Sequence, residues 1–290
     1  MEPASTHLLA GGTLVAVAVV LALIVEVLSS RRRGEEVARR LVQEIGLLRY
    51  TLREPAAAAN GARAVATIAV FNEERNLPAV LARMPPGVDV IVIDDGSTDG
   101  SAEVARRHGA RVLRHSMNLG QGAAVVTGLR TALLDDYDVI VEMDGDGQHD
   151  PAEIPLFVAE LESTDVDIVV GSRLAGSNYH GAPLPRRLLL PVVTALVNRI
   201  TGFSLTDSMC GFRAFRTSSL RRAEPLLERF REPQYLAVEM FIRFAREGFE
   251  VSEVPIRLNR RSFGTSHKGF FRYGWGIVLV ILRDLLRSER

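Results

Sequence analysis

The segment Val139-Ile-Val-Glu-Met-Asp-Gly-Asp-Gly-Gln-His-Asp-Pro151 decides the fold and the chemistry that this sequence predicts. A short apolar run ends in three aspartates, and the segment contains no Arg or Lys. The pattern predicts a buried strand that is followed by a loop of carboxylates, which repel one another. Because all the candidate ligands are oxygens, the loop predicts a Mg²⁺ or Mn²⁺ site formed by Asp144, Asp146 and Gln148. The alternative is an acidic turn in which Asp150-Pro151 starts a helix.

Composition limits the class of protein. The chain has 290 residues, a hydrophobic content of 47% and a formal net charge of zero. This length is sufficient for one large domain with accessory segments. A chain without net charge has no bulk field that would favour nucleic acid, so no nucleic-acid partner is expected. The single cysteine, Cys210, excludes an internal disulfide framework and a cysteine-based metal cluster.

The first 33 residues predict a transmembrane anchor. Residues 8–25 are uncharged and, with residues 26–28, are about long enough to cross a ~30 Å hydrocarbon layer as a helix. Three arginines follow at positions 31–33, and no Arg or Lys precedes the run. The positive-inside rule therefore predicts a single-pass membrane protein whose catalytic domain lies on the cytoplasmic face. The alternative is a buried helix of a soluble protein.

Two other segments predict helices at a membrane surface. Residues 34–63 have apolar positions at helical spacing among many arginines and then an Ala-rich stretch, which predicts a juxtamembrane helix and a linker. Residues 261–290 begin with a basic loop and end in an apolar run that is too short to span, which predicts an interfacial amphipathic helix. In both cases the alternative is packing against the neighbouring domain.

Residues 64–260 predict one α/β domain. Apolar, β-branched runs alternate with helical patterns, as expected for a mostly parallel sheet covered by helices on both faces. The expected strands are 65–71, 88–93, 111–113, 139–143 and 167–170. The expected helices between them are 77–84, 101–108, 122–134 and 151–161.

Polar clusters follow all five expected strands. They are Asn72-Glu73-Glu74, the Asp94-Asp95-Gly-Ser-Thr-Asp99 turn, Asn118-Leu-Gly-Gln-Gly122, the acidic loop and Gly171-Ser172-Arg173. Ligands of such sheets bind at the carboxyl ends of the strands. The first strand is not followed by G-x-G-x-x-G, which argues against a dinucleotide site. Five clusters at five strand ends therefore predict a binding site of another kind, beyond turn formation and helix capping alone.

Between about Thr67 and Lys268, these ordered motifs resemble the inverting family 2 glycosyltransferases of the GT-A fold. Within that family the chain is most similar to the polyprenyl-phosphate sugar synthases of the dolichyl-phosphate mannosyl- and glucosyltransferase type. Asp144-Gly-Asp146, with Gln148 two residues on, matches the D-x-D motif. The resemblance implies a Rossmann-like GT-A domain and Mg²⁺ or Mn²⁺. It also implies a GDP- or UDP-linked sugar donor and an undecaprenyl, decaprenyl or dolichyl phosphate acceptor among membrane lipids.

The resemblance also assigns residues to the donor. Residues that match its nucleotide and diphosphate positions are Phe71, Glu73, Asp94, Asp95, Ser97, Gly120, Asp144 and Asp146. Relatives usually have proline where this chain has Ala69, which loosens a turn near the base. The sequence leaves the base and the sugar open, and it is compatible with a homo-oligomer.

Basic residues match the phosphate and acceptor positions of the family. Arg173 lies in its G-S-R motif, and Arg186 or Arg187, at the start of an expected helix over 186–200, matches a second basic position. Arg261-Ser-Phe-Gly-Thr-Ser266 matches R-x-x-G-x-S, but His267 separates it from the lysine that usually follows. The implied acceptor and phosphate set is Arg173, Arg186, Arg187, Arg261, Ser266 and Lys268. The implied catalytic set is Asp146, Asp207, Arg261 and Lys268.

The acceptor determines whether a general base is needed. A polyprenyl phosphate is already ionised, whereas a hydroxyl on a lipid or glycan would need a carboxylate base. Asp207 is the candidate base, and the alternative for it is an ion pair with Arg213. Glu239 either lies beneath the acceptor pocket or is solvated. A hydroxyl acceptor stays the alternative activity. A non-catalytic nucleotide-sugar-binding scaffold is the alternative of another class, and the intact acidic set argues against it.

Overall fold

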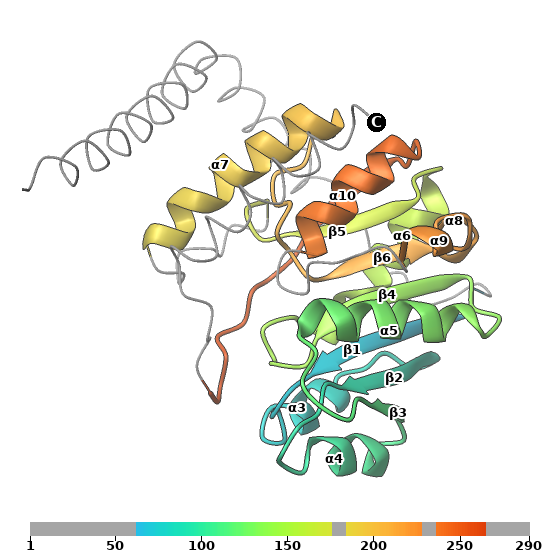
Figure 1. The fold of residues 1–290 in the computed structure, drawn as a ribbon, viewed down its shortest axis with the longest axis vertical. Coiled ribbons are helices and arrows are strands. Elements are labelled where there is room, and N and C mark those ends of the chain that lie inside the picture. The colour runs from blue at the N-terminus through green and yellow to red at the C-terminus, as the bar shows by residue number, and fades with distance from the viewer. Residues whose placement is uncertain (1–61, 176–183, 228–235, 265–290) are drawn as a thin grey trace, which may run out of the picture. The chain divides into compact units, whose positions relative to one another are not determined.

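The computed structural model describes residues 62–175, 184–227 and 236–264, with the backbone alone for 184–189 (Figure 1). The five expected strands are confirmed. They are β1 (Ala64–Val70), β2 (Val88–Asp94), β3 (Arg111–Arg114), β4 (Val139–Asp144) and β5 (Ile168–Ser172). The expected helices between them are also confirmed. They are α3 (Leu77–Leu81), α4 (Ser101–Arg107), α5 (Gln121–Leu133) and α6 (Ile154–Ser163), the last preceded by the 3₁₀ turn η1 (Pro151–Glu153).

Two strands that the sequence pattern did not predict complete the sheet, β6 (Arg213–Arg216) and β7 (Val251–Pro255). Within the described residues the sheet has seven strands in the order β3-β2-β1-β4-β6-β5-β7. β6 runs antiparallel to both β4 and β5, and the other neighbouring pairs are parallel. The sheet is therefore mixed but mostly parallel.

Helices cover the sheet and extend one end of the domain. α5 packs across β1, β2 and β4, and α6 packs on β5, β6 and β7. The remaining helices are α7 (Leu184–Thr201), α8 (Thr217–Arg222), α9 (Glu224–Leu227) and α10 (Leu236–Arg246). α7 and α10 pack against each other beside the β5 end of the sheet (Figure 1).

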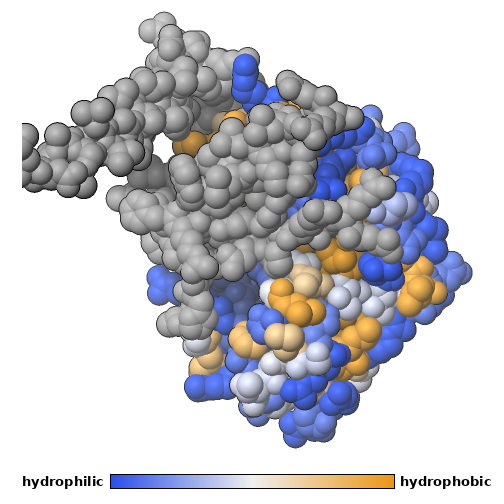
Figure 2. Space-filling model, viewed as in Figure 1, coloured by the Kyte–Doolittle hydropathy of each residue, from blue (hydrophilic) through white to orange (hydrophobic). Residues whose placement is uncertain are grey.

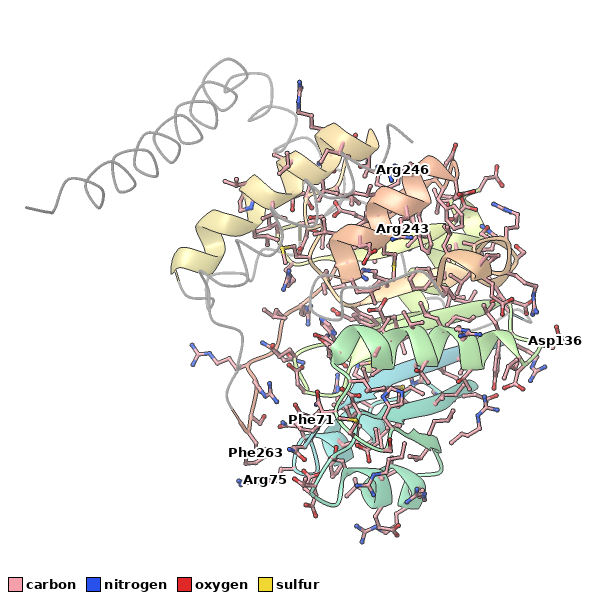
Figure 3. The ribbon with its side chains drawn as sticks, viewed as in Figure 1. Phe71, Arg75, Asp136, Arg243, Arg246 and Phe263 are labelled. Carbon is pink, nitrogen blue, oxygen red and sulfur yellow. The ribbon has the colours of Figure 1, made fainter. Side chains whose placement is uncertain are left out.

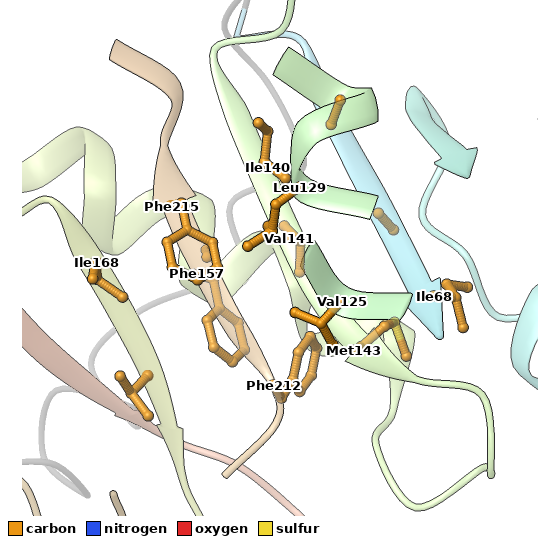
Figure 4. Packing of buried hydrophobic residues seen from close by; sticks show 14 of the residues in the cluster. Ile68, Val125, Leu129, Ile140, Val141, Met143, Phe157, Ile168, Phe212 and Phe215 are labelled. Atoms are coloured by element: carbon orange, nitrogen blue, oxygen red, sulfur yellow. The ribbon is translucent and has the colours of Figure 1, made fainter. Parts of the chain in front are cut away.

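The core lies between the sheet and these helices. Ile68 of β1 and Val141 of β4 are fully buried, as is Phe157 of α6. The ring centroid of Phe157 is 4.3 Å from that of Phe212 (Figure 4). Each such side chain stabilises the fold by roughly 1.5–3 kcal/mol through burial.

On the face that Figure 2 shows, hydrophobic side chains form small patches among hydrophilic ones.

None of the helices in the described ranges combines the length and the apolar character needed to cross a bilayer. The predicted anchor over residues 1–33 and most of the segment 34–63 lie outside the described residues, as does the segment 261–290 from residue 265 onward.

Candidate active site

The candidate site lies along the edge where the parallel strands end. In the sheet register, Ala69 of β1 is level with Asp144 of β4, and Val70 is level with Asp94 of β2. The polar clusters that follow these strands therefore meet at one edge, as the sequence predicted. Arg173 follows β5 directly at the same edge.

The acidic loop is held tightly around Asp144. Gln121, at the start of α5, donates a hydrogen bond from Nε2 to Oδ1 of Asp144 at 2.6 Å. Gly145 has no room for a side chain, because a Cβ there would lie 2.5 Å from Cγ1 of Val70. At Gly211 a Cβ would lie 3.4 Å from Oδ2 of Asp144. Gly145 is therefore packed against β1, and Gly211 lies beside the second carboxylate oxygen.

Asp146 lies next to this carboxylate and increases the negative charge of the loop. The backbone N–H of Gln148 donates to Oδ1 of Asp146 at 3.0 Å. Burial raises the pKa of Asp146, and the charge of Asp144 raises it further. A cation bound here would relieve this repulsion, and the all-oxygen donors suit a divalent ion. The ligand roles of Asp144, Asp146 and the Gln148 amide stay predictions.

Within the described ranges, no three His, Cys, Asp or Glu side chains are grouped to hold a metal ion. His149 lies in the acidic loop and is buried, and burial lowers its pKa. Its ring lies 5.2 Å from that of Phe212, centroid to centroid. The sequence pattern gave no signal for His149, although it lies between Asp146 and Asp150.

Asp94, the last residue of β2, and Asp95, which follows it, shape the turn at the end of this strand. Asp94 is fully buried, accepts a hydrogen bond from the N–H of Ser97 at 2.9 Å and lies 3.1 Å from Nε of Arg114. Asp95 is also buried and accepts hydrogen bonds from the N–H groups of Leu119 at 2.9 Å and Gly120 at 2.8 Å. Both carboxylates thus hold backbone N–H groups of the loops at this edge of the site. Their contact with a nucleotide stays a prediction.

Two further features fix the same turn. Gly96 has a φ of +75°, and a Cβ there would lie 2.5 Å from the carbonyl carbon of Met117, so only glycine fits. His115 contacts Asp95 through Nδ1 at 2.7 Å and Thr127 through Nε2 at 3.0 Å. His115 also could not be predicted from the sequence, because its contacts are with residues 12 and 20 positions away.

The segment after β7 crosses to the donor side of the site. Arg261 forms an ion pair with Glu73, and its Nη1 lies 3.7 Å from Oδ2 of Asp146. Asn76 donates from Nδ2 to Oε2 of Glu73 at 2.6 Å and to the carbonyl of Phe263 at 3.1 Å. Burial raises the pKa of Glu73, which the hydrogen bond from Asn76 opposes. The structure therefore brings together residues of the donor and acceptor sets that are about 190 positions apart.

Aromatic side chains border this contact. Figure 3 shows Phe71, Arg75 and Phe263 at the same end of the domain. The guanidinium carbon of Arg75 lies 3.9 Å from the ring centroid of Phe263. Phe71 and Phe263 are both substantially exposed. Two apolar rings therefore stand beside the charged groups.

Asp207 and Arg173 form a buried ion pair at the β5 end of the site. Arg173 donates from Nε to Oδ2 of Asp207 at 2.5 Å and from Nη2 to Oδ1 at 2.8 Å. The expected alternative, an ion pair between Asp207 and Arg213, is wrong. Arg213 is buried beside Glu142, with Nη1 3.3 Å from Oε2, because β6 pairs with β4 and aligns these two residues. Burial raises the pKa of Glu142 to about 7.

The other candidate residues are placed as follows. Glu239 is fully buried and accepts a hydrogen bond from Nη2 of Arg243 at 2.6 Å, so the solvated alternative is wrong. Arg186 and Arg187 lie in the first turn of α7, where only the backbone is described. Ser266 and Lys268 lie outside the described residues.

The glycosyl transferase family 2 model matches residues 66–223. The chain belongs to glycosyl transferase family 2, and it is a glycosyltransferase with a GT-A fold.

Two curated relatives cover most of the chain. It is 34% identical over 228 residues to an undecaprenyl-phosphate mannosyltransferase of Micrococcus luteus, covering 75% of this chain and 92% of that protein. It is 30% identical over 224 residues to a polyprenol monophosphomannose synthase of Mycolicibacterium smegmatis, covering 73% and 83%.

Solved structures support the fold. A mannosyl-3-phosphoglycerate synthase from Rubrobacter xylanophilus superposes with a TM-score of 0.61 at 19% identity, covering 79% of this chain and 76% of that one. A glucosyl-3-phosphoglycerate synthase from Mycobacterium tuberculosis, solved with Mn²⁺, uridine diphosphate and glucosyl-3-phosphoglycerate, gives 0.56 at 19% identity, covering 79% and 82%.

Proposed function

We propose that this glycosyltransferase moves a sugar from a GDP- or UDP-linked donor to a polyprenyl phosphate at the cytoplasmic face of a membrane. The names of the Micrococcus and Mycolicibacterium relatives support a polyprenyl phosphate as the class of acceptor. Both relatives are aligned over most of their own length, so the likeness includes the acceptor half of the domain as well as the donor half.

The observation that carries the proposal is the state of Asp207. A hydroxyl acceptor needs a carboxylate that can approach it and take its proton. Asp207 is fully buried, and both of its oxygens accept hydrogen bonds from the Arg173 guanidinium. This carboxylate is therefore committed to a cation and is not placed to act as a base. A phosphate acceptor, already ionised, has no need of one.

Charge neutralisation is then the main task of the site. Asp144 and Asp146 would hold a divalent cation, Mg²⁺ or Mn²⁺, which supplies positive charge to the leaving diphosphate when bound. Arg261 lies within 3.7 Å of Asp146 and brings a guanidinium to the same side. A planar guanidinium suits two-point contact with phosphate oxygens. We assign Arg261, with Arg173, Arg186, Arg187, Ser266 and Lys268, to aligning the two anionic substrates.

The membrane segments fit the same proposal. A single-pass anchor over residues 1–33 and an interfacial helix within residues 261–290 would hold the domain at the leaflet that contains the lipid phosphate. The nucleotide sugar would reach the site from the cytoplasm.

A substrate panel tests this function. The purified full chain is incubated with Mn²⁺ or Mg²⁺, with GDP- and UDP-linked sugars in turn, and with either a polyprenyl phosphate or the matching dephosphorylated prenol. We expect sugar transfer to the phosphate alone. Equal transfer to the prenol would support a hydroxyl acceptor, and binding of nucleotide sugar without any transfer would support the scaffold alternative.

A further inference from the structure

Glu253 lies on β7, an edge strand of the sheet, and is partly buried close to the candidate site. Its Oε1 accepts a hydrogen bond from the N–H of Asp207 at 2.9 Å. Its Oε2 accepts two hydrogen bonds from Thr206, from the N–H at 2.7 Å and from the hydroxyl at 2.8 Å. One carboxylate thus binds three donors of two consecutive residues that lie more than forty positions earlier in the chain.

The segment that Glu253 fixes forms one wall of the acidic loop. At its first end, Asp207 holds Arg173 through two hydrogen bonds. Further along, Sγ of Cys210 lies 4.0 Å from Nε2 of His149. Gly211 then lies beside the Asp144 carboxylate, where an added Cβ would be in van der Waals contact with Oδ2 at 3.4 Å. A displacement of residues 206–207 would therefore move the side chain of Arg173 and alter the packing against the acidic loop.

The neighbouring strand supports the same anchor. The hydroxyls of Ser172 and Thr206 are 2.5 Å apart, and the N–H of Ala175 donates to the Ser172 hydroxyl at 3.1 Å. β5 and β7 pair in parallel with Val170 level with Glu253, so the sheet places the acid beside a residue of β5 three positions before Arg173. The carboxylate is thus held by regular sheet geometry and by its hydrogen bonds to a turn.

We infer that Glu253 is a positioning residue for sugar transfer: it fixes Asp207, and Asp207 fixes the guanidinium of Arg173 at the edge of the active site. This inference rests on the proposed function, in which Arg173 contributes positive charge beside the anionic substrates. Glu253 itself touches no substrate. Its effect on catalysis comes through a fixed backbone turn and one buried ion pair.

A double-mutant cycle tests the inference. Glu253→Gln keeps the shape but replaces one acceptor oxygen by an NH₂ donor, which faces an existing donor of Thr206 or Asp207. We expect kcat to fall about tenfold, with the KM for the acceptor changed by less than about twofold. The reason is that Arg173 acts on charge that develops during transfer. Glu250→Gln, an exposed change of the same type three residues away, is the matched control and should leave kcat unchanged.

The coupling between substitutions at Glu253 and Arg173, measured as non-additive changes in kcat, separates this positioning effect from a general loss of folding. Arg173→Lys keeps the positive charge but removes the two-point contact with Asp207. In that background Glu253→Gln should lower kcat by less than about twofold, because the route through Arg173 is already broken. All rates are measured well below the unfolding midpoint of each variant. A tenfold loss in both backgrounds, or a wild-type kcat in the single variant, would overturn the inference.

Two further arms keep the inference testable. If Glu253→Gln does not fold, Glu253→Asp, which keeps the charge on a shorter side chain, replaces it in the same cycle. If the wild type transfers no sugar to a polyprenyl phosphate, the proposed function fails. The cycle is then measured as affinity for UDP and for GDP in the presence of Mn²⁺. Non-additive losses there would still support positioning by Glu253, and additive losses would overturn it.

Discussion

Replacing Asp207 by Asn tests whether this carboxylate is a structural charge or a proton acceptor. Asp207 is fully buried and receives two hydrogen bonds from Arg173, whose side chain is only 5% exposed. Removing one partner of a buried ion pair costs about 3–5 kcal/mol, because the other charge stays uncompensated. The Asn amide keeps one acceptor oxygen. We therefore expect the free energy of unfolding to fall by about 3 kcal/mol, at the lower end of that range.

The assay combines unfolding with turnover. Urea unfolding of the full chain, followed by circular dichroism, gives the free energy of unfolding of the wild type and the variant. Asp165→Asn, at an exposed position before β5, is the matched control and should change it by less than about 0.5 kcal/mol. Transfer to polyprenyl phosphate, measured at a temperature where the Asp207 variant stays folded, should fall by no more than roughly tenfold. The loss is expected to be this small because the variant disturbs the position of Arg173 but removes no general base.

A different pair of results would refute this reasoning. General base catalysis contributes about 10²–10⁴-fold to a rate. If Asp207→Asn left the free energy of unfolding unchanged and lowered kcat about a thousandfold, Asp207 would be a base. The hydroxyl-acceptor alternative would then explain the site better than a polyprenyl phosphate does.

Four further experiments test other parts of the site. Asp146→Ala should lower divalent-dependent turnover at least about a hundredfold, a loss of roughly 3 kcal/mol in barrier stabilisation, and full activity in EDTA would contradict the metal assignment. Arg261→Ala, which removes the contacts to Glu73 and Asp146, should lower kcat/KM at least about tenfold, while the neighbouring exposed Arg260→Ala should not. Burial raises the pKa of Glu253 from 4.5 to about 7. Between these values the folded state binds a proton that the unfolded state releases, so stability should fall by roughly 1–3 kcal/mol as the pH rises through this window. Urea unfolding at pH 5 and pH 8 should show a smaller fall for Glu253→Gln, and equal falls would contradict this assignment. Protease added to intact cells should leave the catalytic domain uncut, whereas cleavage from outside would reverse the predicted orientation.

The donor side of the site could be predicted from the sequence because its parts are local. β1, β2 and β4 are mostly apolar runs, and each ends in a polar cluster at the same edge of a mostly parallel sheet. Asp144 is the last residue of β4 and Asp146 lies two residues on, so the end of this strand places both carboxylates at the edge. The same local pattern correctly placed Glu73 after β1.

β6 could not be predicted in the same way. It is four residues long, Arg-Ala-Phe-Arg, and an arginine at its start does not suggest a buried strand. Arg213 is tolerated there because Glu142 of the adjacent β4 lies beside it. The partner residue is about seventy positions away in the sequence, and only antiparallel pairing of the two strands brings them together.

The sequence alone determined the order of strands and helices from β1 to α6, and the edge of the sheet where the chemistry lies. Hydrophobic periodicity, turn residues and acidic spacing act over a few residues, so a linear pattern contains them. Tertiary structure decided which charges pair. Asp207 pairs with Arg173 and not with Arg213. Glu253 accepts hydrogen bonds from the turn at Thr206 and Asp207, and Arg261 pairs with Glu73. These pairs depend on burial. A charge that is removed from water needs a partner within hydrogen-bonding distance, and the packing of the whole chain determines which residue that partner is.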